Sequence, residues 1–141
     1  MYEQGRAGPL ATDGCSMPRV LIADDEDSMR TLVARAIAMD GHDTVTAKDG
    51  AEALEILSRE QGAFDLLLTD IQMPVMDGIA LALTAARDFP DLTILLMTGF
   101  ADQRERAHGL NAIVYDVVTK PFSVADIRTA VATALAARKA D

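Results

Sequence analysis

Short apolar runs alternate along this chain with segments in which apolar residues recur at helical spacing. The runs are rich in leucine and β-branched residues, which predicts buried strands over Arg19–Ala23, Thr44–Ala47, Phe64–Thr69, Thr93–Thr98 and Asp116–Thr119. Apolar positions three and four residues apart predict helices over 29–37, 53–57, Gly78–Phe89, Ala101–Leu110 and the segment after Ser123. The helix over 101–110 is charged, so we expect it to be weak and exposed.

Capping signals mark several of these helix boundaries. Asp49 followed by Glu52, and Ser123 followed by Asp126, have the three-residue spacing of a capping box. Gly41 follows the first helical segment at the place where a glycine commonly ends a helix. Capping residues therefore support the helix boundaries that the hydrophobic period predicts.

Five strands alternating with five helices predict a parallel sheet that is covered by helices on both faces. The two common arrangements of this kind are the six-stranded Rossmann sheet and the five-stranded flavodoxin-like sheet, and five strands favour the second. We therefore expect an α/β fold with a flavodoxin-like (βα)5 sheet in the order 2-1-3-4-5. In such sheets a ligand binds at the carboxyl ends of the strands.

Composition narrows the class of protein further. The 141 residues suit one domain, and 13 Lys and Arg against 22 Asp and Glu leave a net charge of −9. This charge argues against nucleic acid as a partner, and no apolar run is long enough to cross a bilayer. Cys15 is the single cysteine, which fits a reducing, cytoplasmic compartment. A lone cysteine and two distant histidines make a structural zinc site improbable.

The first 18 residues differ from the rest of the chain. They contain several Gly and Pro residues and no hydrophobic period, so we expect a disordered arm over 1–18 and one domain over 19–139. Met17 is one candidate for the natural start of the protein. An inert tail is the simpler interpretation of this arm, and a partner-binding arm is the alternative.

Polar residues stand directly after the predicted strands. They are Asp24, Asp25, Glu26 and Asp27 after the first strand, Asp70 after the third, Thr98 and Gly99 after the fourth, and Lys120 after the fifth. In a parallel sheet these positions meet at one edge, where each carboxylate pair about 4 Å apart repels by about 4 kcal/mol at an effective dielectric near 20. A divalent cation with hard oxygen ligands relieves this repulsion, and Mg²⁺ suits such a site.

Each of these signals alone has an ordinary structural explanation. An acidic run favours a helix N-terminus, an Asp after a strand is common in turns, and a Lys before a Pro is usually at the surface. The convergence of all of them at one edge of one sheet is what favours a functional site.

Four runs, LIADDEDSMR, LLLTDIQMPVMDG, LLMTG and VVTKPF, resemble the receiver domain of bacterial response regulators. The resemblance covers Arg19 to about Lys139. It implies that Asp70 is a phosphoacceptor that attacks a phosphohistidine donor, so that the chain is a phosphoacceptor domain and not an enzyme in its own right. It also implies that Pro74 and Gly78 shape the loop that holds Asp70.

The same resemblance implies a ligand set. Asp25 and Asp70 are expected to ligate Mg²⁺ directly together with the backbone carbonyl of Gln72, and Asp24 is expected to act through a water molecule. Thr98, Gly99 and Lys120 are expected to bind the phosphoryl oxygens. The metal and the lysine then neutralise charge in a loose transition state, so positioning and electrostatics carry most of the rate.

The stretch TGFADQRERAHGLNAIVYDVVTKPFSV is similar to short stand-alone receivers of the CpdR type. This similarity implies phosphate from a histidine phosphotransferase or histidine kinase, and an adaptor role in proteolysis by the ClpXP machine, with the ClpX unfoldase as partner. No nucleic acid or membrane partner is expected, and the chain is expected to be a monomer or weak dimer. Its end at Asp141 is expected to leave no room for an output domain.

Two positions depart from the family pattern. Many receivers carry an aromatic residue three positions before the lysine, where this chain has Val117, with Tyr115 two residues earlier; Ile113 stands where many have Gly. We therefore expect phosphorylation to be coupled to partner binding through the backbone after Thr98. The expected partner face includes Arg104, Arg106, Tyr115 and the helix after Ser123.

Two other functions stay open beside the adaptor. A phosphate sink or relay intermediate would share all of these residues. A Mg²⁺-dependent aspartyl-phosphate hydrolase would need an acid two residues after its nucleophile, where this chain has Gln72.

Overall fold

A computed structural model describes residues 17–99, 107 and 109–140 of the chain. The predicted arm before Met17 and most of the predicted helix over 101–110 lie outside the described residues. The described elements are β1 (Arg19–Ala23), α1 (Asp27–Ala38), β2 (Asp43–Ala47), α2 (Gly50–Arg59), β3 (Leu66–Asp70), α3 (Gly78–Asp88), β4 (Thr93–Thr98), β5 (Asp116–Thr119) and α5 (Val124–Ala140).

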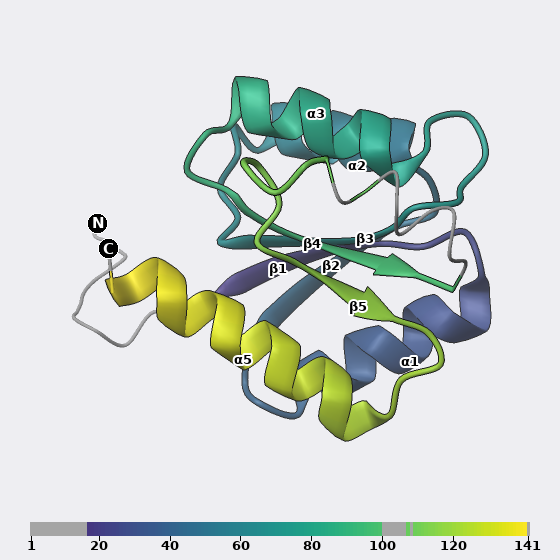
Figure 1. Ribbon diagram of the computed structural model, residues 1–141, viewed down its shortest axis with the longest axis vertical. Helices are drawn as coiled ribbons and strands as arrows, with labels where there is room; N and C mark the ends of the chain where they lie inside the picture. Colours follow the sequence, from purple (N-terminus) through teal and green to yellow (C-terminus); the bar gives the residue numbers. More distant parts are fainter. Residues whose placement is uncertain (1–16, 100–106, 108, 141) are drawn as a thin grey trace.

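The sheet has the predicted topology. Its five strands lie in the order β2-β1-β3-β4-β5, and every neighbouring pair is parallel. Helices cover both faces, with α2 and α3 on one side and α1 and α5 on the other (Figure 1). Because all neighbouring strands are parallel, the carboxyl ends of the five strands lie at the same edge of the sheet.

Alternate residues of the central strands divide the core into two layers. Leu21, Leu67 and Leu96 pack under α2 and α3, whereas Val20, Leu68 and Met97 pack against α1 and α5. The central strands β1, β3 and β4 are buried on both faces almost throughout, which is why their sequences read as continuous apolar runs. The edge strands β2 and β5 are only partly buried, so their polar residues face water.

Helix ends follow the predicted capping signals. The Asp49 side chain accepts a hydrogen bond from the Glu52 N–H at 2.8 Å, and Glu52 in turn accepts from the Lys48 N–H at 2.7 Å. Ser123 and Asp126 form a complete reciprocal box, with both bonds at 3.0 Å. Gly41 lies just beyond α1 with a φ of +85°, in the left-handed region that glycine adopts without strain.

Both boundaries of the third strand differ from the sequence expectation. Phe64 lies before β3, which begins at Leu66 and continues to Asp70, so the candidate acceptor belongs to the strand itself. The third strand therefore ends one residue later than predicted. Among the described helices, none is long and apolar enough to cross a membrane.

Candidate functional site

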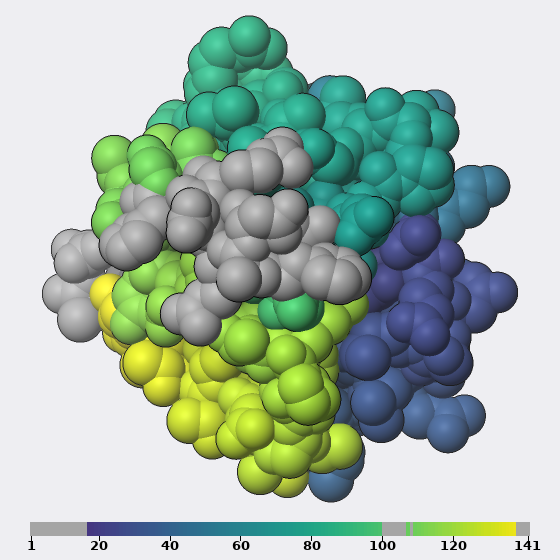
Figure 2. Space-filling view, turned by 45° about the vertical axis from the view of Figure 1, so that its right-hand side comes forward, coloured from purple at the N-terminus to yellow at the C-terminus, as the bar shows by residue number. Residues whose placement is uncertain are grey.

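The candidate site lies where the strands end. Asp24 follows β1, Asp70 is the last residue of β3, Thr98 is the last residue of β4, and Lys120 follows β5. Figure 2 turns this end of the sheet forward, and the purple start of α1, the teal α2–α3 layer and the green chain near β5 lie around one face. The topology thus brings together residues that lie up to 96 positions apart in sequence, as between Asp24 and Lys120.

Three carboxylates and one ammonium group form the centre of this site. One oxygen from each of Asp24, Asp25 and Asp70 lies within 4.8 Å of the others. The Nζ atom of Lys120 lies 3.3 Å from Asp70 Oδ2 and 3.6 Å from Asp24 Oδ2. Asp24 has no exposed surface and Asp70 is 7% exposed, whereas Asp25 is exposed to solvent.

The two oxygens of Asp24 have different surroundings. Asp24 Oδ1 accepts a hydrogen bond from the Glu26 N–H at 2.9 Å, which fixes the orientation of the carboxylate. Asp24 Oδ2 is buried and has no hydrogen-bond partner among the described residues, since Lys120 approaches it only to ion-pair distance. A buried carboxylate oxygen without a donor is costly, and a bound cation is one partner that satisfies it. The residues present therefore fit a divalent metal.

Burial dominates the protonation of both buried carboxylates. It raises the pKa of Asp70 above the ordinary value of 3.8, against the lowering effect of Lys120, while the nearby Asp24 adds to the rise. Burial likewise raises the pKa of Asp24, against the hydrogen bond from Glu26 and the charge of Lys120. The fold therefore disfavours the charged form of these carboxylates until more positive charge reaches the site.

Thr98, Gly99 and Lys120 lie together beside the acceptor strand. Thr98 is fully buried, and its carbonyl oxygen accepts a hydrogen bond from the Lys120 N–H at 2.7 Å. The peptide bond between Lys120 and Pro121 is cis. A Cβ added to Gly99 would lie 3.6 Å from the Lys120 Cβ, an ordinary contact, so close packing does not by itself require glycine at position 99.

The loop that follows Asp70 is shaped by glycine, as expected for Gly78. The Gly78 N–H donates to the Ile71 carbonyl at 2.8 Å, and a Cβ at Gly78 would lie only 2.0 Å from the Asp70 carbonyl oxygen. Gln72, whose carbonyl is the expected metal ligand, has an exposed side chain within this loop. Gly50 and Val75 also shape the loop, and no sequence signal points to either; Val75 has a φ of +70°, which its residue type does not predict.

Val117 and Tyr115, the two positions discussed for the aromatic switch, have different surroundings. Val117 is partly buried and packs against the core layer under α2 and α3. Tyr115 lies before β5 rather than within it, is 45% exposed, and lines a groove of about 630 Å³ together with Leu92 and Ala134. This groove opens at the amino ends of the strands, away from Asp70. Arg104 and Arg106 of the expected partner face lie outside the described residues.

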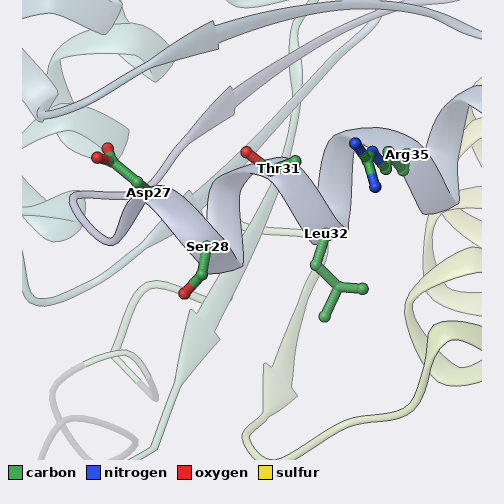
Figure 3. Close-up of a pocket in the computed structure, with 5 residues that line it drawn as sticks. All are labelled: Asp27, Ser28, Thr31, Leu32 and Arg35. Carbon is green, nitrogen blue, oxygen red and sulfur yellow. The ribbon is translucent and has the colours of Figure 1, made fainter.

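A second, shallow groove of about 510 Å³ follows the exposed side of α1. Figure 3 shows its two rows of side chains, one with Asp27, Thr31 and Arg35 and the other with Ser28 and Leu32. Since α1 begins two residues after Asp25, this groove adjoins the carboxylate cluster.

Comparison with known families gives one match that spans most of the chain. The model of the response regulator receiver domain matches residues 20–132. The matched range contains all of the candidate site residues described above. It also extends from the first described strand into the last helix.

Known proteins agree with this match. The chain is 40% identical over 111 residues to the response regulator receiver protein CpdR of Brucella abortus (strain 2308), covering 79% of this chain and 91% of that protein. It is 35% identical over 117 residues to the probable transcriptional regulator ycf27 of Guillardia theta, covering 83% of this chain and 45% of that protein. The chain thus spans about half the length of such transcriptional regulators.

A solved structure has the same fold. The CheY-like response regulator receiver domain protein of Methanospirillum hungatei JF-1 superposes with a TM-score of 0.80 at 26% identity, covering 89% of this chain and 98% of that one. The expected five-stranded α/β architecture is therefore confirmed by the topology and by this likeness.

Proposed function

The chain belongs to the family of response regulator receiver domains, and from that membership we propose that it accepts a phosphoryl group on Asp70 to switch its contact with a partner protein. We take residues 19–139 as the receiver unit. The observation that carries the proposal is the convergence of Asp24, Asp25 and Asp70 with Lys120, together with a buried oxygen of Asp24 that accepts no hydrogen bond from the part of the chain that the structure describes.

In the proposed reaction an oxygen of Asp70 forms a bond to the phosphorus atom of a phosphohistidine. The bond between phosphorus and the donor's imidazole nitrogen breaks, and its electron pair stays on that nitrogen. Bound Mg²⁺ would supply positive charge to the phosphoryl oxygens and would be held by Asp25, Asp70 and the Gln72 carbonyl, with Asp24 acting through water. The acceptor must be ionised to attack, so the nearby Lys120 ammonium favours the reactive form of Asp70.

Lys120 and Thr98 have separate roles in this proposal. The Lys120 ammonium lies 3.3 Å from Asp70 Oδ2 before phosphorylation, and it would move its contact to a phosphoryl oxygen afterwards. Thr98 ends the neighbouring strand and would offer its hydroxyl to another phosphoryl oxygen. Gly99 would offer its N–H. Since the Lys120 N–H is already bonded to the Thr98 carbonyl, movement of either residue is coupled to the other.

A protein donor must reach Asp70 over the edge at which α1 begins. The groove along α1 therefore belongs to the surface that we propose a histidine kinase or histidine phosphotransferase covers. Phosphorylation replaces the single charge of the Asp70 carboxylate by the nearly two negative charges of a phosphoryl group, so the donor would leave a site that is more negative than its cation-bound state.

For the output, we propose an adaptor that controls proteolysis of the ClpXP type, with the ClpX unfoldase as partner. The support for this finer statement is the 40% identity to CpdR over 91% of that relative's length. The alternative is a phosphate sink or relay intermediate without a dedicated output partner. An aspartyl-phosphate hydrolase is disfavoured because Gln72, two residues after Asp70, cannot transfer a proton.

The test of the acceptor is incorporation of phosphate from acetyl phosphate with Mg²⁺, measured by intact mass. We expect one phosphate on the wild type and none on Asp70→Asn, whose amide is nearly isosteric with the carboxylate. Asp91→Asn is the matched control, because Asp91 is exposed at the far end of the sheet, and it should label normally. Labelling that persists in Asp70→Asn would move the nucleophile elsewhere.

The test of the output is capture of purified ClpX by the immobilised protein with and without beryllofluoride. An adaptor should bind ClpX with an affinity that differs between the two states. Equal or absent binding in both states would remove the adaptor and leave the phosphate sink or relay.

A further inference from the structure

The loop between Asp70 and α3 contains a strained turn. Val75 has a φ of +70°, and the Met76 N–H donates back to the Pro74 carbonyl at 2.7 Å, so the three residues form a γ-turn of the positive-φ type. A β-branched residue rarely adopts this conformation, and the Val75 side chain is 84% exposed and gains nothing from packing. Contacts elsewhere must therefore hold the turn in place.

The contact that holds the turn comes from a different part of the chain. The N–H of Gly50, the first residue of α2, donates to the Met76 carbonyl oxygen at 3.1 Å. A Cβ on Gly50 would lie 2.4 Å from that oxygen and 3.0 Å from the carbonyl carbon. Both atoms belong to the backbone, so no side-chain rotation relieves such a contact.

The helix that carries Gly50 is itself fixed at its start. Asp49 caps α2 through the Glu52 N–H, and Glu52 accepts from the Lys48 N–H on the other side. Gly50 directly follows the capping residue Asp49 and is buried. Its N–H belongs to the first turn of a helix, where amide groups have no partner within the helix, so the Met76 carbonyl fills an open position.

The turn is connected to the acceptor over a short path. Gly78 follows Met76 by two residues, donates to the Ile71 carbonyl, and packs so close to the Asp70 carbonyl that a Cβ would lie 2.0 Å from it. A displacement of Met76 is therefore passed on to Asp70. The same displacement reaches Gln72, because Gln72 directly follows Ile71, whose carbonyl accepts the hydrogen bond from Gly78.

We propose that Gly50 is a positioning residue for phosphoryl transfer, which acts by clamping the turn at Val75 and so fixing the loop that carries Asp70 and the Gln72 carbonyl. This inference rests on the proposed function. It concerns a residue on α2, which takes no direct part in the chemistry of the carboxylate cluster.

The test compares Gly50→Ala with two controls. Gly109→Ala introduces the same atom where nothing lies within 4 Å. Ile56→Val removes a buried methylene from the core face of α2 and lowers stability without touching the loop. For each protein, phosphorylation by acetyl phosphate is measured across Mg²⁺ concentrations to separate the half-saturating Mg²⁺ from the maximal rate, and Mg²⁺ binding is measured by calorimetry.

We expect Gly50→Ala to weaken Mg²⁺ binding and to lower the phosphorylation rate about tenfold or more, since misplacement by about 1 Å costs on the order of 100-fold. Both controls should keep the wild-type Mg²⁺ dependence, although Ile56→Val melts earlier. If Gly50→Ala matches the controls in half-saturating Mg²⁺, in maximal rate and in Mg²⁺ binding, Gly50 is only a packing residue and the proposal is wrong.

A second variant covers the case in which Gly50→Ala does not fold. Glycolic acid placed at position 50 by cell-free translation replaces the N–H by an oxygen and adds no bulk, so it removes the clamp without a clash. It should raise the half-saturating Mg²⁺, and an unchanged value would overturn the proposal. If the wild type takes up no phosphate, the proposed function fails instead, and calorimetry still decides whether Gly50 positions the cation ligands.

Discussion

The two ends of the parallel sheet both gather carboxylates around one cation, with opposite results. At the amino end, the backbone N–H of Arg19 donates to Asp65 at 2.8 Å, and its guanidinium donates to the Ala63 carbonyl at 3.0 Å. The same guanidinium lies 2.9 Å from Glu60 and 3.4 Å from Asp43. The planar guanidinium, with several donors in fixed directions, thus satisfies acceptors from β2 and from the segment between α2 and β3 at once.

At the carboxyl end, Lys120 alone among the described cations faces both Asp24 and Asp70, and it leaves one oxygen of Asp24 without a hydrogen bond. A single ammonium group cannot offset two buried carboxylates and a third at their rim. The difference teaches that the amino end is arranged for stability. The carboxyl end buries two of its carboxylates beside a single ammonium group, which lowers stability and leaves a place for a cation and a phosphoryl group.

The largest expected effect on stability comes from removal of Lys120. Lys120→Met leaves Asp24 and Asp70 without a compensating charge, and we expect it to lower the free energy of unfolding in metal-free buffer by about 3 kcal/mol at neutral pH. Chemical denaturation measures this, with the exposed Lys48→Met as control. A variant as stable as the wild type would mean that the carboxylates are not held charged at this end.

Neutralising a carboxylate at the same end is expected to raise the free energy of unfolding. Asp70→Asn removes one member of a like-charge pair whose oxygens lie within 4.8 Å. We expect the metal-free variant to be more stable than the wild type by roughly 2–3 kcal/mol at neutral pH. Denaturation curves in the presence of a chelator test this, and a destabilised Asp70→Asn would contradict the charge imbalance.

At the amino end, we expect removal of the cation Arg19 to lower stability. Arg19→Ala removes a hydrogen bond to Ala63, two ion pairs and the packing over the Phe64 ring, whose centre lies 4.4 Å from the guanidinium carbon. We expect a loss of about 2 kcal/mol. Arg87→Ala is the control, because among the described residues that exposed side chain pairs only with its neighbour Asp88, and it should leave stability unchanged. Equal losses in the two variants would remove the contrast between the ends.

The smallest effect is a dependence on pH. Because burial raises the pKa of Asp24 above 3.8, the native state binds a proton that the unfolded state has lost, so this group costs stability as the pH rises from 3.8 through the raised value. The advantage of Asp24→Asn over the wild type should be absent below that window and grow across it, by no more than about 1.4 kcal/mol per pH unit. A constant difference from pH 3 to pH 7 would argue against the raised pKa.

The sequence predicted the strands and the site because both rest on local signals. Continuous apolar runs indicated buried strands, and parallel pairing then required Asp24, Asp70 and Lys120 to meet at one edge. The exposure of β2 and β5 was not predicted, since a short strand that contains two apolar residues looks like a central one in sequence.

Other features depend on contacts between distant connections and were not predicted. The Arg19 cluster needs Asp43, the first residue of β2, and Glu60, which follows α2, and their relative position follows only from the folded sheet. The turn at Val75 runs against the preference of its residue type, and it exists because Gly50 and Gly78 hold the loop. Local propensity therefore fails where tertiary contacts determine the backbone.

The dependence of unfolding on Mg²⁺ tests most directly whether the carboxyl end is a cation site whose charge imbalance is relieved on binding. For the wild type and for Arg19→Ala, we expect the free energy of unfolding to rise by about 2.7 kcal/mol when Mg²⁺ reaches one hundred times its dissociation constant. For Asp24→Asn and Asp70→Asn, the rise should be lost or greatly reduced. A wild-type stability that does not change with millimolar Mg²⁺, or a rise of the same size in all four proteins, would contradict the account.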